Sequence, residues 1–214
     1  MYSVSRVTQS DVEDIMKFMK RIFFTSEPLC TTVGYCQSES EETPDMDDFL
    51  HSCLPDESIQ AKDGDGNIVG VLICGPVPLL NPGVNLNELK SCRSPKYKKF
   101  VQMMFLREMI LEIWNVYPND DRVFEIKLAC TDPKWRKKGI MNALMKEAEN
   151  AAKELNIRLM RIDTTSAYSA KSAERLGFKC VFSRAYKDLT LDGKPLIVPA
   201  PPHVEDKVFV KELY

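Results

Sequence analysis

The stretch Leu128–Met141 constrains the fold of this chain more than any other part of the sequence. The apolar-rich run Val123–Cys130 predicts a strand, and Pro133, shortly after it, predicts a turn. Over Gly139–Leu155 the apolar residues recur at helical spacing, which predicts a long amphipathic helix. A strand, a short basic loop and a helix in this order are typical of a domain in which helices pack on a sheet.

The basic loop of this unit has the chemistry of an anion site. The first turn of a helix carries N–H groups without intrahelical partners, together with the positive end of the helix dipole. Gly139 allows the backbone to approach a ligand closely, and Arg136, Lys137 and Lys138 add positive charge. A pyrophosphate group fits this arrangement, although the loop matches neither GxxxxGKS/T nor GxGxxG. A plain strand–turn–helix with surface lysines is the alternative interpretation.

Strands and helices are interleaved along the whole chain, so we expect one α/β domain over residues 1–214. Thr8 and Asp11 resemble a capping box at the start of the first helix. The turn Asp63–Asn67 predicts a β-hairpin. The expected strands are Tyr2–Val7, Ser58–Lys62, Ile68–Val77, Val123–Cys130, Leu159–Asp163, Cys180–Tyr186 and Lys207–Leu213. The expected helices are Val12–Thr25, a short one after Pro44, Asn85–Cys92, Pro95–Tyr117, Gly139–Leu155 and Ser166–Leu176.

Charge and composition exclude several classes of function. Lys and Arg number 29 and Asp and Glu 31, a formal net charge of −2, which is not typical of a nucleic-acid-binding protein. No apolar run reaches the roughly 20 residues that cross a bilayer, and the N-terminus does not resemble a signal peptide. The seven cysteines form no CxxC pair, and the two histidines lie far apart in the sequence. We therefore expect free thiols, no metal site, no membrane or nucleic-acid partner, and a cytoplasmic protein.

The segment Arg136–Met141 resembles the R/Q-x-x-G-x-G/A signature of the GNAT acyltransferases, which bind the pyrophosphate of acetyl-CoA. Met141 departs from it, since the family usually has Gly or Ala there. The run Leu176-Gly177-Phe178 is similar to the closing L-G-F of the family. The resemblance covers nearly the whole chain and implies a single-domain GNAT fold, a mixed sheet of about seven strands flanked by helices. It also implies that acetyl-CoA is the co-substrate, with Ile140 and its neighbours in the signature binding it.

A narrower resemblance lies in Phe24–Leu29 and Asp163–Ser169. Both segments are similar to insect-type arylalkylamine N-acetyltransferases, the group that includes dopamine N-acetyltransferase. In that group a Glu-Pro pair after the first helix supplies the general base, which here is Glu27. The resemblance implies a small-molecule amine of the dopamine, serotonin or tryptamine type, and a monomer. Phe24, Pro28 and Tyr35 are the expected substrate-binding residues.

The resemblance also implies roles for residues on two other elements. Leu128, Ala129 and Cys130 would hold the pantetheine arm, with the backbone N–H of Cys130 facing the thioester carbonyl. Many family members have a tyrosine acid where this chain has Ala173, so the nearby hydroxyls become the candidate proton donors to the thiolate. Those candidates are Ser169, which we favour, and Thr165. Alternatively these hydroxyls cap the helix that follows, a role we expect for Ser166. His203 lies in a proline-rich loop from which it could relay the proton of the amine.

Other functions remain open from the sequence. A GNAT enzyme acting on polyamines or protein lysines would suit the acidic stretch Glu39–Asp48, which would raise the local concentration of cations. A CoA-binding module without turnover is compatible with Met141 and Ala173. An unrelated α/β domain would bind a nucleotide at the loop Arg136–Gly139, with stabilisation by ATP or NAD but not by CoA.

Overall fold

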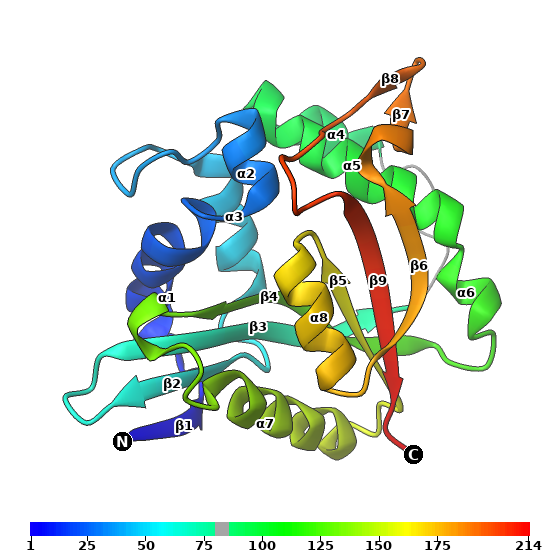
Figure 1. Ribbon diagram of the computed structural model, residues 1–214. Coiled ribbons are helices and arrows are strands. Elements are labelled where there is room, and N and C mark those ends of the chain that lie inside the picture. The colour runs from blue at the N-terminus through cyan, green and yellow to red at the C-terminus, as the bar shows by residue number, and fades with distance from the viewer. Residues whose placement is uncertain (80–85) are drawn as a thin grey trace.

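The computed structural model describes residues 1–79 and 86–214, and the side chains of residues 86–88 also lie outside this description. Figure 1 shows a central sheet with helices on both faces. The helix expected over Asn85–Cys92 is α4, Leu86–Ser91, and Asn85 lies outside the described residues.

The order of elements confirms the expected interleaving of strands and helices. Short turns of 3-10 helix occupy Gln9–Asp11, Pro133–Trp135 and Tyr186–Asp188, and one turn of π-helix, Lys20–Phe24, extends α1. The strands are β1 Tyr2–Arg6, β2 Ile59–Asp63, β3 Ile68–Pro78, β4 Arg122–Thr131, β5 Leu159–Thr164, β6 Lys179–Ala185, β7 Thr190–Leu191, β8 Lys194–Pro195 and β9 Glu205–Glu212. The remaining helices are α1 Val12–Met19, α2 Pro28–Val33, α3 Pro44–Cys53, α5 Pro95–Leu111, α6 Ile113–Val116, α7 Ile140–Glu154 and α8 Ala167–Arg175.

In the described part of the chain, seven strands form one mixed sheet in the order β1-β2-β3-β4-β5-β9-β6. All neighbours are antiparallel except β4 and β5, which are parallel and pair only from Phe124–Ile126 to Met160–Ile162. Beyond Ile126, β4 continues beside β3 to Thr131, whereas β5 continues beside β9 to Thr164. The sheet therefore splits between β4 and β5, and its two halves diverge in Figure 1.

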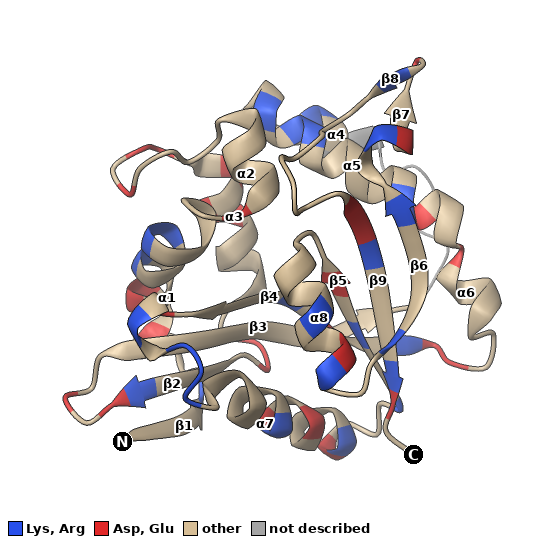
Figure 2. Ribbon diagram, in the orientation of Figure 1, with Lys and Arg blue, Asp and Glu red and all other residues tan. Residues whose placement is uncertain are grey.

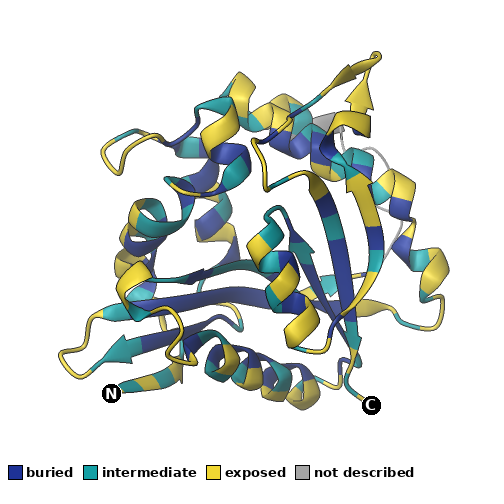
Figure 3. Cartoon of the chain, in the orientation of Figure 1, coloured by how far each residue is buried: buried dark blue, intermediate teal, exposed yellow. Residues whose placement is uncertain are grey.

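Each face of the sheet has its own apolar core. Residues of α1, α2, α3 and α5 pack on one face, whereas α7 and α8 pack on the other. The amphipathic helix predicted from the sequence is α7, which buries Ile140, Leu144 and Ala148 and exposes its polar side, as Figure 3 shows. The expected capping box at Thr8 is also present, because the Thr8 N–H donates to Asp11 at 2.9 Å.

Three segments differ from the prediction, and the first is α2, Pro28–Val33, where no helix was expected. The helix expected over Pro95–Tyr117 is broken at Glu112, whose φ of +46° lies in the left-handed region. The break starts a new helical turn that buries Ile113 at 2% exposure, so packing overrides the continuous helical pattern. The expected loop Gly193–His203 begins with part of a small hairpin, because β8 pairs with β7 there.

Candidate active site

Glu27 lies at the N-terminus of α2, where its side chain caps the helix. Its Oε2 accepts the Cys30 N–H at 2.6 Å, and Pro28 occupies the first helical position, where no N–H is needed. The residue is 8% exposed, so the carboxylate is almost buried. Burial, with the charge of Glu27, raises the pKa of the Cys30 thiol, which therefore stays protonated at neutral pH.

Thr165 reaches the same carboxylate from the other half of the sheet. Its hydroxyl donates to Glu27 Oε1 at 2.7 Å, although the two residues are 138 positions apart in the sequence. Thr165 follows the last residue of β5 and precedes α8. Both oxygens of Glu27 therefore accept a hydrogen bond, which fixes the direction in which the carboxylate faces.

Ser166 and Ser169 form a reciprocal cap at the start of α8. Ser166 Oγ accepts the Ser169 N–H at 3.0 Å, and Ser169 Oγ accepts the Ser166 N–H at 3.3 Å. The Ser169 hydroxyl donates to the Ser166 carbonyl at 2.9 Å. Ser166 is the cap expected from the sequence, and in the structure Ser169 takes part in the same cap. Ser169, the favoured proton donor, therefore also stabilises the start of α8.

His203 also contacts the start of α8. Its Nδ1 accepts the Ala167 N–H at 3.2 Å, and its ring lies edge-on to Tyr168 with a centroid distance of 5.4 Å. An Nδ1 that accepts a hydrogen bond carries no proton, so the neutral ring carries its proton on Nε2. The contact ties the proline-rich loop to the start of α8, next to Thr165.

A groove of about 250 Å³ lies between α2 and the proline-rich loop. Pro28, the residue after Glu27, forms part of its wall together with His203, whereas Glu27 itself does not line it. Its remaining lining residues are Thr31, Thr32, Pro199, Ala200 and Pro201. None of these side chains is acidic, so the groove offers prolines, threonines and an imidazole to a ligand.

Phe24, Pro28 and Tyr35, the expected substrate-binding residues, take different positions. Pro28 is half-buried and lines the groove, whereas Phe24 is fully buried. Tyr35 is 3% exposed and packs in an aromatic cluster with Tyr97 and Phe100. The structure therefore places Phe24 and Tyr35 in the core of this face rather than along the groove.

The end of β4 borders the split in the sheet. Leu128, Ala129 and Cys130 lie beyond the last residue that pairs with β5, and they pair with β3 on the other side. In an antiparallel pair alternate residues turn their N–H and C=O groups away from the partner, so some of these groups face the split. Burial raises the pKa of the Cys130 thiol to about 12, which leaves the thiol protonated and poorly nucleophilic at neutral pH.

The loop between β4 and α7 is basic and tightly turned. Arg136, Lys137, Lys138 and Gly139 are all exposed, and the loop is blue in Figure 2. Lys137 and Gly139 have φ values of +62° and +81°, a backbone conformation that residues other than glycine rarely adopt. The Lys138 ammonium lies 4.2 Å from the centroid of the Trp135 ring, which anchors one cation of the loop.

The helix that follows this loop has an apolar first turn. Ile140 is 2% exposed, and Met141 packs against the core of the α7 face. The unusual residue of the signature, Met141, is thus accommodated by the core, and the start of α7 keeps its unpaired N–H groups.

The acidic stretch Glu39–Asp48 makes mainly local contacts. Asp45 accepts the backbone N–H groups of Arg93 and Ser94 at 2.7 and 2.9 Å, and Asp48 pairs with the Arg93 guanidinium. Glu41 accepts the Gln37 N–H at 2.6 Å. Much of this stretch therefore ties α3 to the start of α5, which weakens the case for an acidic rim that recruits cations.

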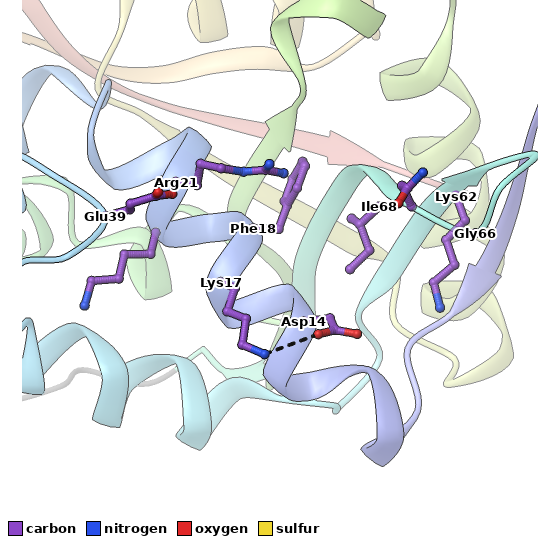
Figure 4. A pocket seen from close by; sticks show the side chains of 10 residues that line it. Asp14, Lys17, Phe18, Arg21, Glu39, Lys62, Gly66 and Ile68 are labelled. Atoms are coloured by element: carbon purple, nitrogen blue, oxygen red, sulfur yellow. Dashed lines mark ion pairs between the residues drawn. The ribbon is translucent and has the colours of Figure 1, made fainter.

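A larger hollow of about 610 Å³ lies between α1 and the β2–β3 hairpin, as Figure 4 shows. Its lining includes none of the site residues expected from the sequence. Two of its cations are neutralised locally, since Lys17 lies 3.6 Å from Asp14 and Lys62 lies 2.7 Å from Asp11. The hollow is therefore separate from the contacts around Glu27.

The described residues were also searched for metal-binding groups and membrane-spanning helices. Over 1–79 and 86–214 no group of three or more His, Cys, Asp or Glu side chains could hold a metal ion. None of the helices in that part of the chain has the length and apolar character needed to cross a membrane.

The chain is similar to known acetyltransferases in sequence and in structure. A profile of the acetyltransferase (GNAT) family matches residues 17–178. Arylalkylamine N-acetyltransferase 2 from Aedes aegypti has a similar crystal structure, with a TM-score of 0.90 and 25% identity over 100% of this chain and 99% of that one. Drosophila melanogaster polyamine N-acetyltransferase, which forms N-acetylagmatine, has a TM-score of 0.86 and 25% identity over 99% and 100%. A mosquito arylalkylamine N-acetyltransferase like 5b, with a TM-score of 0.86 and 23% identity over 99% and 100%, shares the fold.

Proposed function

This chain belongs to the acetyltransferase (GNAT) family, and from that premise we propose that it transfers the acetyl group of acetyl-CoA to the primary amine of an arylalkylamine. The acceptors would be of the dopamine, serotonin or tryptamine type. The observation that carries the proposal is the buried carboxylate of Glu27, held by Cys30 and Thr165 beside the groove at Pro28. A carboxylate fixed in this way is suited to accept a proton from a bound ammonium group.

The reaction begins with removal of a proton from the amine. An alkylammonium has a pKa of about 10, similar to that of lysine, so at neutral pH it must be deprotonated before it attacks. In the proposed mechanism Glu27 takes this proton, directly or through one water. The amine nitrogen then forms a bond to the thioester carbonyl carbon, and the C–S bond breaks. As the tetrahedral intermediate collapses, the nitrogen releases its second proton to solvent, and the CoA thiolate accepts a proton from solvent or from a nearby hydroxyl.

The cofactor side of the proposal rests on β4 and the loop before α7. Leu128, Ala129 and Cys130 would bind the pantetheine arm along the split, with the Cys130 N–H directed at the developing oxyanion. The loop from Arg136 to Met141 would bind the pyrophosphate through its cations and the start of α7. Because the Cys130 thiol is buried and protonated, direct attack by the amine is favoured over an acyl-cysteine intermediate.

The lining of the groove supports an aromatic acceptor over a polyamine. Prolines and an imidazole offer flat, weakly polar surfaces that suit an aromatic ring. A polyamine carries a second cation that needs an acidic partner, and none of the residues that line this groove supplies one. The similarity to a polyamine N-acetyltransferase at 25% identity keeps that acceptor class as the alternative.

The test is acetyl transfer from acetyl-CoA to a panel of amines: dopamine, serotonin, tryptamine, spermidine and a lysine peptide. Product should be identified by mass, because thiol-reactive dyes would also report the exposed Cys180. Acetylated arylalkylamines as the main products would support the proposal. Spermidine or peptide as the only acceptor would replace the substrate class, and acetyl-CoA binding without any product would replace catalysis by a binding role.

A further inference from the structure

We propose that Tyr186 is a positioning residue for Glu27: its hydroxyl fixes the Thr165 carbonyl, and this holds the Thr165 hydroxyl on the Glu27 carboxylate. The sequence offers no signal for this role, since there Tyr186 is only the last residue of the strand expected over Cys180–Tyr186. The inference rests on the proposed function in that Glu27 acts there as the general base.

The Tyr186 side chain is a buried and well-anchored donor. It is 1% exposed, and its hydroxyl donates to the Thr165 carbonyl oxygen at 2.8 Å. Its backbone is also fixed, because its N–H donates to Val204 at 3.1 Å and its carbonyl accepts from Leu189 at 3.2 Å. Because both its backbone and its hydroxyl are hydrogen-bonded, the Tyr186 side chain links the turn after β6 to the turn after β5.

The turn after β5 depends on such outside partners. Ser166 and Ser169 satisfy each other within the cap, and the Ala167 N–H is taken by His203. Thr165 precedes the cap, so its carbonyl lies outside the helical hydrogen-bond ladder. The Tyr186 hydroxyl supplies the partner for that carbonyl, and the backbone orientation of Thr165 decides where its own hydroxyl points.

The surroundings of Tyr186 keep it in the donor state. Burial, followed by the negative charges of Asp206 and Glu27, raises its pKa above the ordinary tyrosine value, against the opposing charge of Arg107. Asp206 is fully buried and lies 3.3 Å from Arg107, which also pairs with Asp163 at 2.5 Å. The hydroxyl therefore stays protonated throughout the neutral range, so it can donate but not titrate there.

The experiment is a double-mutant cycle with Tyr186→Phe and Thr165→Val. Thr165 donates to a charged carboxylate, and Tyr186 is proposed to hold that bond in place, so we expect each single variant to lower kcat/KM for the amine about 10-fold or more. The KM for acetyl-CoA should stay unchanged.

The combination of variants separates positioning from plain structural support. If Tyr186 acts through the Thr165 hydroxyl, adding Tyr186→Phe to Thr165→Val lowers kcat/KM by less than about twofold more. In a Thr165→Ser background, which keeps the hydroxyl, Tyr186→Phe should again cost about 10-fold. Tyr117→Phe, which removes a half-buried hydroxyl near Glu212 at the other end of β9, is the matched control and should change neither kcat/KM for the amine nor the Cys30 resonance.

A readout without turnover distinguishes failure of this inference from failure of the proposed function. The Cys30 amide donates to Glu27, so its resonance in a nitrogen–proton NMR spectrum reports on the carboxylate. Tyr186→Phe and Thr165→Val should shift it in the same direction even if no amine is acetylated. An unmoved Cys30 resonance, or losses of rate that multiply fully in the double variant, would overturn the positioning role.

Discussion

Replacing Glu27 by Gln separates its role as the cap of α2 from its proposed role as the general base. In the native protein Oε2 accepts from the Cys30 N–H and Oε1 accepts from the Thr165 hydroxyl. A glutamine can direct its carbonyl oxygen at Cys30 and its NH₂ group at the Thr165 oxygen, which then accepts. Both contacts survive, so the folded state should lose less than about 0.5 kcal/mol. The base is lost, and kcat/KM should fall about 10²- to 10⁴-fold.

Glu27→Ala provides the comparison. It removes the base and also the cap of α2, which costs about 1 kcal/mol. For a chain of this length that corresponds to a fall in Tm of roughly 2–4 °C. The assay is acetylation of the best amine under kcat/KM conditions, with product measured by mass, and Tm is measured by scanning calorimetry on the same preparations. Activity of Glu27→Gln within about threefold of the native enzyme, with a lowered Tm only in Glu27→Ala, would mean that Glu27 is a cap and not a base.

Three further predictions concern other parts of the site. Gly139→Ala forces a residue with a side chain into a left-handed conformation, which costs about 1–2 kcal/mol. The KM for acetyl-CoA should therefore rise about 5- to 30-fold. Gly193→Ala, at a φ of +74° in an exposed hairpin, should strain the chain equally and leave this KM unchanged. His203→Asn keeps an acceptor near the Ala167 N–H at the position of Nδ1 and should hold Tm and kcat better than His203→Gln; a larger loss in the Asn variant would contradict the contact at Nδ1. Cys130→Ala should retain kcat within about threefold, because the thiol is buried and protonated, and a mass spectrum of the protein with acetyl-CoA should show no acyl adduct at Cys130.

Local signals in the sequence predicted much of the fold. The apolar periodicity of α7, the turn Asp63–Asn67 and the caps at Thr8 and Ser166 depend on near neighbours in the chain, and each is present in the structure. The predicted fold class is confirmed, since the chain is a single GNAT domain with a mixed seven-stranded sheet. The acetyl-transfer chemistry of the family agrees with the resemblance at Arg136, whereas the substrate class and the residue roles stay predictions.

Long-range packing accounts for what sequence patterns missed. Tyr35 was expected to bind substrate, yet it packs against two aromatic rings of α5. The left-handed break at Glu112 follows from burial of Ile113, which no local signal announces. The contact between Tyr186 and Thr165 joins segments 21 positions apart and depends on how β6 and β5 lie on either side of β9. Such contacts are set by strand order, which amino-acid periodicity does not encode.

If the pantetheine arm lies in the split between β4 and β5 as proposed, the concentration of acyl-CoA would affect the stability of the folded protein. Past Ile126, β4 has backbone groups that β5 does not pair with, so a pantetheine arm lying there would serve as a replacement strand. Hydrogen bonds that select the acyl donor would then be the same bonds that complete the sheet. By mass action, a ligand at one hundred times its Kd stabilises the folded state by about 2.7 kcal/mol. The lifetime of this enzyme against heat and proteolysis would accordingly follow the acyl-CoA pool of the cell.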